Sequence, residues 1–264
     1  MLNFCSLYSG STGNCLLVNS KHTNLLIDAG VSLKKIEQAL ASLEINPQNI
    51  GGILVTHEHS DHIQSIGNIS KKYHIPVYTN IETWNAISEE QHAKIEFKNV
   101  KHFSINEKFA IGDIEILPFS IPHDAANPCG FNLFHNCSKI SIATDLGHIT
   151  PEILKNLEKS SFIMLESNYE PEVLKFSNYP YVLKKRIDGP NGHLSNILAG
   201  QTISKLIPYG LKSVMLGHLS KENNFPELAY RTVLEQLNKN NISSTSICLH
   251  VANRSTPSSL INIA

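Results

Sequence analysis

The chain has 264 residues, enough for one large domain with a substantial core, and its charged and hydrophobic fractions are those of an ordinary folded protein. The 22 lysine and arginine residues nearly balance the 23 aspartate and glutamate residues, which argues against nucleic-acid binding through a global positive field. The five cysteines are scattered without a CxxC pair, so we expect reduced thiols in a cytoplasmic protein. We expect neither a secretory leader nor contact with a membrane.

The first part of the chain is expected to alternate strands with helices. Apolar runs predict strands at residues 2–8, 15–19, 24–27, 52–55 and 76–78. Ser32 is placed to cap a helix that turns Ile36, Leu40 and Leu43 inward. The apolar spacing between residues 63 and 73 predicts a second helix, and a short third helix is expected to start near Asn80.

The middle of the chain is richer in short β runs, and the second half alternates again. Strands are predicted at 94–103, 108–111, 114–119, 130–134 and 139–143, with a hairpin turn at Gly112-Asp113. Thr150 and Pro151 should begin a helix, and further helices are expected at 194–207 and 226–237. Strands at 162–165, 213–216 and 246–249 complete the pattern. This order predicts a single α/β domain over 1–264, with two packed sheets and helices outside.

Residues 56–62, with the sequence THEHSDH, are the densest chemical motif in the chain. They lie between an apolar strand and a helix and contain three imidazoles and two carboxylates. Both groups are suitable ligands for zinc and, less strongly, for manganese or iron. His57 and His59 can converge on one cation, and Asp61 and His62 on a second. The alternatives are a solvated polar turn and a histidine cluster without metal, and the density of the motif disfavours both.

Further polar residues follow predicted strands in the same way. Asp28 follows the strand at 24–27, His123 and Asp124 come after 114–119, and Asp145 and His218 follow two later strands. Open α/β folds collect their sites at such strand ends. We therefore expect these residues to complete a metal centre.

The motif His57/His59/Asp61/His62, with Asp28 before it and the later strand-end residues in order, resembles the metallo-β-lactamase superfamily. The segments at 8–15 (YSGSTGNC), 165–168 (LESN), 183–187 (LKKRI), 192–196 (GHLSN) and 217–224 (GHLSKENN) are similar to its YycJ/WalJ branch. The resemblance implies a four-layer αβ/βα sandwich with two metal ions at the sheet edge. It also implies a metal-dependent nuclease with 5′→3′ exonuclease action on DNA.

The resemblance also assigns the ligands. The first site would contain His57, His59 and His123, and the second Asp61, His62 and His218, with Asp145 bridging the two divalent ions. Asp28 would orient a histidine or the loop. The sequence does not separate zinc from manganese. One departure is visible, because Tyr169 and Glu170 stand where the branch is expected to have His-Asp.

Two metal ions could share a hydroxide that attacks phosphorus in line. Asp61 would ligate and align the proton of that hydroxide, and His193 would bind the phosphate or protonate the leaving oxygen. For His193, a helix cap or a packed imidazole is the alternative.

Two segments are candidates for substrate contacts. The loop containing Ser9, Ser11, Thr12 and Asn14 could receive a phosphate as a nest of backbone N–H groups, or it could be a tight structural turn. The run Lys184-Lys185-Arg186 could follow a nucleic-acid backbone, or it could be a solvated face. Nearby Tyr179 and Tyr181 could stack on bases or pack in the core.

Two other functions are compatible with the motif: a hydrolase that acts on a different substrate, and a protein without catalytic activity. A thioesterase or small-ester hydrolase of the glyoxalase II kind would use the same metal centre, because HxHxDH alone does not select the substrate. A regulatory or scaffold protein on a hydrolase fold would lack ligands, and none is missing. The choice of DNA or RNA, and of exonuclease or endonuclease action, remains open at this level.

Overall fold

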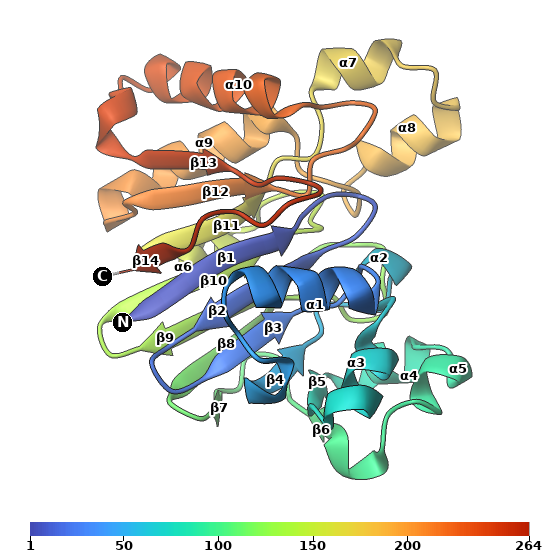
Figure 1. Cartoon of the computed structure of the whole chain (residues 1–264). Coiled ribbons are helices and arrows are strands. Elements are labelled where there is room, and N and C mark those ends of the chain that lie inside the picture. Colours follow the sequence, from blue (N-terminus) through green and yellow to red (C-terminus); the bar gives the residue numbers. More distant parts are fainter. Residues whose placement is uncertain (264) are drawn as a thin grey trace.

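The computed structural model describes residues 1–263, in which two seven-stranded sheets pack face to face with helices on both outer surfaces (Figure 1). The first sheet has the order β14-β1-β2-β3-β4-β5-β6, antiparallel up to β3 and parallel from β3 to β6. Its strands are β1 (Leu2–Tyr8), β2 (Cys15–Asn19), β3 (Asn24–Ile27), β4 (Ile50–Leu54), β5 (Val77–Thr79), β6 (Val100–His102) and β14 (Ile261–Ile263).

The second sheet has the order β13-β12-β11-β10-β9-β8-β7, parallel from β10 to β13 and antiparallel from β7 to β10. Its strands are β7 (Phe109–Ile111), β8 (Ile114–Ser120), β9 (Cys129–His135), β10 (Ser138–Ala143), β11 (Phe162–Glu166), β12 (Ser213–Gly217) and β13 (Cys248–Val251). Each half of the chain thus builds one sheet, and β14 returns to the edge of the first.

Ten α-helices and four 3₁₀ turns connect the strands in residues 1–263. In the first half they are α1 (Leu33–Ser42), η1 (Pro47–Asn49), α2 (Ser60–Ile63), α3 (Ile66–Tyr73), α4 (Ile81–Ala86), α5 (Glu89–His92) and η2 (Phe97–Asn99). In the second half they are α6 (Pro151–Leu157), α7 (Pro171–Phe176), α8 (Tyr181–Ile187), α9 (Asn196–Leu206), η3 (Ile207–Tyr209), α10 (Pro226–Lys239) and η4 (Ser244–Ser246).

Side chains alternate between the two faces of each sheet, and this alternation produces the layers of the fold. Phe162 and Met164 enter the core between the sheets, where the ring centroids of Phe162 and Phe4 lie 4.6 Å apart. Their neighbours Ile163 and Leu165 enter the outer cluster beneath α6, α9 and α10. The first sheet follows the same rule, with α1 and α3 on its outer face. The predicted sandwich of two sheets covered by helices is confirmed.

The single helix predicted over residues 63–73 is wrong, because the chain forms α2 and α3 with a break between them. In a continuous helix the N–H of Ser65 would donate to the carbonyl of Asp61. That carbonyl instead accepts from the N–H of Asn14 at 2.8 Å, and Ser65 donates to the carbonyl of Ala29, also at 2.8 Å. Tertiary contacts around the metal motif therefore override the local apolar spacing.

Other sequence-based boundaries are also wrong, and the strand predicted at 246–249 is β13, which begins only at Cys248. The strand predicted at 94–103 exists only as β6, and it is preceded by η2, where Phe97 is 93% exposed. The helix predicted from Leu194 begins at Asn196, because the N–H of Leu194 donates to the Glu166 carboxylate and Ser195 caps α9. The elements α5, α7, α8 and β14 were not expected. No helix within residues 1–263 has the length and apolar character that crossing a bilayer requires.

The fold brings three loops into close backbone contact beside the metal motif. Gly30 follows β3, and its N–H donates to the carbonyl of Asn14 at 2.7 Å, while Ala29 donates to the carbonyl of His62 at 2.8 Å. A Cβ atom at Gly30 would lie 1.6 Å from the carbonyl oxygen of Asp61. This position therefore tolerates no side chain without moving the metal motif.

We expect Gly30→Ala to lower the free energy of unfolding by about 3 kcal/mol and the melting temperature by about 10 °C, because a backbone atom must shift. Gly51→Ala is the matched control, since a Cβ there meets only ordinary contacts at 3.5 Å or more. Thermal unfolding followed by circular dichroism measures both variants. Equal melting temperatures would contradict the close approach at Gly30.

Candidate metal centre

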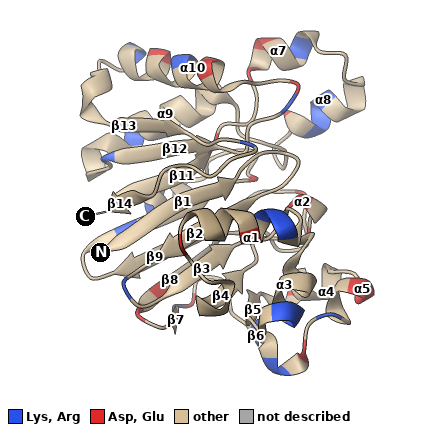
Figure 2. Ribbon diagram, in the orientation of Figure 1, with Lys and Arg blue, Asp and Glu red and all other residues tan. Residues whose placement is uncertain are grey.

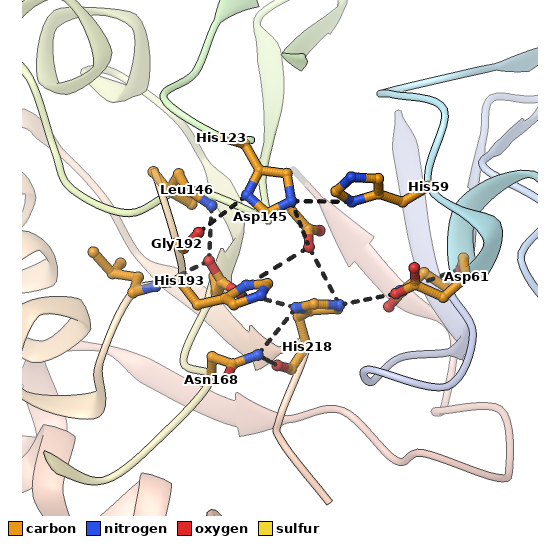
Figure 3. Close-up of polar contacts among 12 residues, drawn as sticks. His59, Asp61, His123, Asp145, Leu146, Asn168, Gly192, His193 and His218 are labelled. Carbon is orange, nitrogen blue, oxygen red and sulfur yellow. Dashed lines mark hydrogen bonds and ion pairs between the residues drawn. The ribbon is translucent and has the colours of Figure 1, made fainter. Parts of the chain in front are cut away.

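The predicted ligands meet where strands of both sheets end at the same edge of the sandwich (Figure 3). Three of the residues that follow strands have left-handed backbone conformations, with φ of +61° at Asp28, +60° at Asp145 and +54° at His218. Non-glycine residues rarely adopt this conformation, and it is typically retained where the surrounding structure imposes it. The turns therefore aim these side chains at a common point.

His57, His59 and His123 form the first group of possible ligands, with one ligand atom from each within 4.8 Å of the others. Nε2 of His123 lies 3.3 Å from Nδ1 of His59. The ring of His57 stands edge-on to both, with centroids at 4.6 Å and 5.0 Å. His57 and His123 are buried, whereas His59 is partly exposed. These are the three residues expected at the first site.

Asp61, His62 and His218 form a second group with the same spacing. Oδ2 of Asp61 lies 3.5 Å from Nε2 of His62 and 3.5 Å from Nε2 of His218. Asp145 lies between the groups, with oxygens 3.3 Å from Nε2 of His62, 3.4 Å from Nε2 of His218 and 3.9 Å from Nε2 of His123. Asp145 thus lies between the two groups, and all seven expected ligands lie in one cluster. The bridging of two ions by Asp145 stays a prediction.

Hydrogen bonds on the far side of the rings set the orientation of the histidines. Nδ1 of His62 lies 2.7 Å from the Asp28 carboxylate, which also accepts from the N–H and the hydroxyl of Thr56 at 2.9 Å each. Nδ1 of His57 contacts the Thr56 hydroxyl at 3.0 Å, and Nδ1 of His123 contacts the carbonyl of Gly192 at 3.0 Å. Each ring thus directs Nε2 toward the centre, as ligating imidazoles do.

The unpartnered atoms of the cluster fit a bound cation. Among residues 1–263, Nε2 of His57 and Oδ2 of Asp145 are buried and make no hydrogen bond of acceptable geometry, and Oδ2 has only the ion-pair contact with Nε2 of His62 at 3.3 Å. Buried polar atoms without partners are costly, and a buried carboxylate normally needs a compensating charge. Imidazole nitrogens and carboxylate oxygens are donors that zinc and manganese accept. The donor set therefore fits metal ions.

Electrostatic coupling links the histidines to the carboxylates. Burial lowers the pKa of His57 well below its ordinary value. Burial also opposes the charged forms of His62 and His218, but nearby carboxylates outweigh it, and Asp145 is the strongest of them. The result is a pKa of His62 well above the usual range and a pKa of His218 raised to about 10.

Glu166 is a site residue that the sequence-based ligand set omitted. This buried carboxylate follows the apolar run of β11, and its Oε1 lies 2.8 Å from Nδ1 of His193 and 2.9 Å from Nδ1 of His218. Its Oε2 accepts the N–H groups of Leu146 and Leu194. The strand-end rule that selected Asp145 would have found it.

His193 lies at the open side of the cluster. Its ring centroid is 5.2 Å from that of His123 and 5.3 Å from that of His218, and a fifth of its side chain is exposed (Figure 3). With Nδ1 held by Glu166, its Nε2 is the atom that can meet a substrate. His193 does not cap α9, because that cap is Ser195, and its role beside the centre stays a prediction.

The loop between β1 and β2 is a tight turn, closed by the N–H of Gly13 donating to the carbonyl of Gly10 at 3.0 Å. Ser9 is buried and accepts the N–H of His218 at 2.8 Å. Asn14 is also buried, and its side-chain amide contacts Nε2 of His62 at 3.1 Å. The polar groups of Ser9 and Asn14 are therefore bonded to residues of the metal centre and are not exposed to a substrate. Ser11 and Thr12 are exposed at the tip of the turn.

The basic run Lys184-Lys185-Arg186 belongs to α8, and its three side chains contact different groups. Nε of Arg186 donates to Asp124 at 2.5 Å, and Asp124 lies 3.5 Å from Nε2 of His123. Lys184 donates to two backbone carbonyls near the end of α7, at 2.7 Å each. Lys185 lies over the ring of Tyr181, 5.6 Å from its centroid. Only Arg186 reaches the edge of the metal cluster.

The two departures from the expected His-Asp pair have internal partners. The hydroxyl of Tyr169 donates to Asp188 at 2.5 Å. The carboxylate of Glu170 accepts from Asn196 at 3.0 Å and from Thr232 at 2.8 Å. These contacts connect α8, α9 and α10 to the loop after β11 and add nothing to the cluster of possible ligands.

Comparisons with known proteins agree with this geometry. A model of the β-lactamase superfamily domain matches residues 23–218. The chain belongs to the β-lactamase superfamily. The family match and the relatives described next place the chain among metal-dependent hydrolases.

Two curated relatives align with most of this chain. Exodeoxyribonuclease YycJ of Bacillus anthracis is 38% identical over 236 residues, which are 89% of each chain. Exodeoxyribonuclease WalJ of Streptococcus pneumoniae serotype 2 strain D39 is 35% identical over 232 residues, 88% of this chain and 86% of the relative. Zinc-bound PqqB from Methylobacterium extorquens shares the fold with a TM-score of 0.73 at 12% identity, over 98% of this chain and 99% of PqqB.

We expect ion uptake at pH 7 to release about two protons per chain, because His62 and His218 carry raised pKa values and imidazole binds metal only in its neutral form. Raised pKa values mean that protons compete with the ions, so metal affinity should increase as pH rises and weaken as it falls. Calorimetric titration of the metal-free protein with Zn²⁺ in buffers of different ionisation enthalpy measures the release. Binding without proton release would contradict this coupling.

Proposed function

We propose that this protein is a two-metal exodeoxyribonuclease that shortens DNA in the 5′→3′ direction. The observation that carries the proposal is the likeness to two exodeoxyribonucleases over nearly nine tenths of the chain. The direction of digestion follows from the activity expected of the branch that the sequence resembles. The seven ligands expected from the sequence all belong to groups whose atoms could hold a metal ion, and such a centre would supply the chemistry that the enzyme needs.

In this proposal His57, His59 and His123 would hold one ion. Asp61, His62 and His218 would hold the second, and Asp145 would contribute to both. Such ions, when bound, lower the pKa of water and offset the charge of a phosphodiester. The grouping is supported by the spacing of the donor atoms and by the unpartnered nitrogen of His57 and oxygen of Asp145.

The chain's own residues then orient the reactants. Asp61 is partly exposed and lies at the face that a substrate can reach, so its carboxylate can hold the proton of the attacking water. That water forms the new P–O bond in line with the bond that breaks, and the oxygen that leaves must receive a proton. His193 is the donor we propose, because Glu166 holds its Nδ1 and leaves Nε2 for the substrate.

We also propose that the protein works in the cytoplasm, where its DNA substrate would lie. All five cysteines are free, and three of them are buried, as expected of thiols in a reducing compartment. The exposed ones, Cys137 and Cys248, lie on different parts of the second half of the chain and form no disulfide.

An assay panel tests the proposed substrate. Single- and double-stranded DNA, RNA and a thioester are each incubated with Zn²⁺ or Mn²⁺. We expect a 5′ label to appear at once in mononucleotides, while a 3′ label passes through a ladder of shortened strands. His59→Ala and Asp145→Ala should each lower the rate by at least about a hundredfold, because they remove charge stabilisation worth several kcal/mol.

The control for these two variants is His22→Ala, an exposed histidine in the turn between β2 and β3, which should keep full activity. Hydrolysis of the thioester alone would contradict the nuclease proposal. Full activity in both ligand variants would contradict the two-metal proposal.

We expect His193→Ala to reduce turnover of DNA by about a hundredfold while the bound metal is retained, because general acid catalysis contributes at least that factor. Elemental analysis of the purified variant gives the metal content, and single-turnover kinetics give the rate. Loss of metal together with activity would instead make His193 part of the structure of the centre.

A further inference from the structure

The helices α7 and α8 form an arm that projects from the sandwich on the side of the metal centre (Figure 1). We use the name α7–α8 arm for residues 171–187. It has a small hydrophobic cluster of its own, made by Tyr169, Leu174 and Ile187 with Tyr179 and Leu183 packed against them. This cluster is separate from the three cores of the sheets, so the arm is a distinct feature of the surface.

The outer surface of the arm carries apolar and aromatic side chains that no packing within the chain explains. Phe176 is 76% exposed, Tyr181 is 72% exposed and Val182 is 78% exposed. Tyr181 also lines a cavity of about 520 Å³ between the two helices, together with Tyr179 and Lys185. This volume lies in the range of cavities that hold small molecules or parts of larger ligands.

Cations accompany these aromatic rings. Lys185 lies over the ring of Tyr181 and Lys175 over the ring of Phe176, at 5.6 Å and 5.1 Å from the centroids. Among the described residues no carboxylate lies within 4 Å of the ammonium group of Lys184 or Lys185, whereas Lys175 is paired with Glu172. Figure 2 shows these basic positions along α8. Within residues 1–263, Lys184 and Lys185 thus carry positive charge without a carboxylate partner beside exposed aromatic surface, while Glu172 and Asp188 line the same cavity.

The inner end of α8 is tied directly to the metal centre. Arg186 donates to Asp124, which neighbours His123. The carbonyl of Ile187 accepts the N–H of His193 at 2.9 Å. Tyr181 and Arg186 are five residues apart, about 7.5 Å along a helix. An extended polymeric ligand that lies along α8 would therefore reach the edge of the metal centre.

We propose that the α7–α8 arm binds the single-stranded end of a DNA substrate, with bases stacked on Tyr181 and phosphates beside Lys184 and Lys185. This inference rests on the proposed function and names the form of its substrate. Aromatic rings beside cations are the usual platform for a single strand, because every base has a face that can stack. A duplex keeps its bases stacked on one another and offers only its phosphates, which would leave the exposed rings without a role.

The test compares binding with hydrolysis in the metal-loaded protein. Fluorescence anisotropy with a phosphorothioate-linked 20-mer measures affinity, and hydrolysis of bis(p-nitrophenyl) phosphate measures the metal centre alone. We expect Tyr181→Ala to weaken single-strand binding about tenfold, because stacking on one base is lost. Tyr181→Phe should bind like the wild type. A blunt duplex of equal length should lose much less affinity, and the small substrate should be hydrolysed at the unchanged rate.

The charge is tested separately. We expect Lys185→Gln to reduce the slope of log affinity against log salt by about 0.7, the value for one phosphate contact on a single strand. The matched controls are Tyr209→Ala, an exposed tyrosine after α9, and Lys21→Gln, in the turn between β2 and β3. Neither control should alter single-strand affinity or its salt dependence.

The outcomes separate this inference from the proposed function. Unchanged single-strand affinity in Tyr181→Ala would overturn the role of the arm and leave its apolar surface to a protein partner, even if the enzyme digests DNA. An equal loss for duplex DNA would overturn the single-strand assignment. The expected binding pattern without hydrolysis of any DNA would support the arm and overturn the nuclease proposal.

Discussion

The structure depends on one constraint, which is that the carboxylate of Asp145 is almost completely buried and one of its oxygens makes no hydrogen bond within residues 1–263. Removing a charged carboxylate from water costs far more than one protein interaction returns, unless cations compensate it. The nearby imidazoles of His62 and His218 compensate part of the buried negative charge, as the raised pKa of each shows. Divalent ions would compensate it fully, because they would bind the carboxylate and the imidazole nitrogens together.

The rest of the centre serves to hold this charge arrangement in place. Asp28 and Glu166 are buried carboxylates whose oxygens contact the outward nitrogens of His62 and His218, and so leave the inner nitrogens directed at Asp145. The strand ends supply these positions from both sheets, and the left-handed turns at Asp28 and Asp145 aim the side chains. The sandwich is thus a rigid frame that brings charged groups closer together than they would remain in a flexible chain.

In our proposals, catalysis and substrate binding occupy separate parts of the molecule. The centre lies among buried side chains of the sandwich, whereas the exposed rings and the lysines without a carboxylate partner in residues 1–263, Lys184 and Lys185, belong to the α7–α8 arm. Arg186 and His193 lie where the two parts meet, since α8 carries the first and accepts a backbone hydrogen bond from the second. A family of hydrolases with one metal centre can differ in substrate through such an attachment without altering the ligands.

The sequence by itself determined the layered α/β fold, the approximate position of every strand except β14, and the set of residues from His57 to His218 that meet in the centre; only β1, β2 and β3 were predicted to the residue. It could do so because apolar alternation is local and because strand ends of a parallel sheet share one edge. Only the tertiary structure decided the break between α2 and α3, the delayed start of α9 and the contacts of Glu166. In each case a backbone or carboxylate group found a partner distant in sequence, and no local pattern records such a partner. The α7–α8 arm was missed for a different reason, because helices of 6 and 7 residues are too short for apolar spacing to identify them.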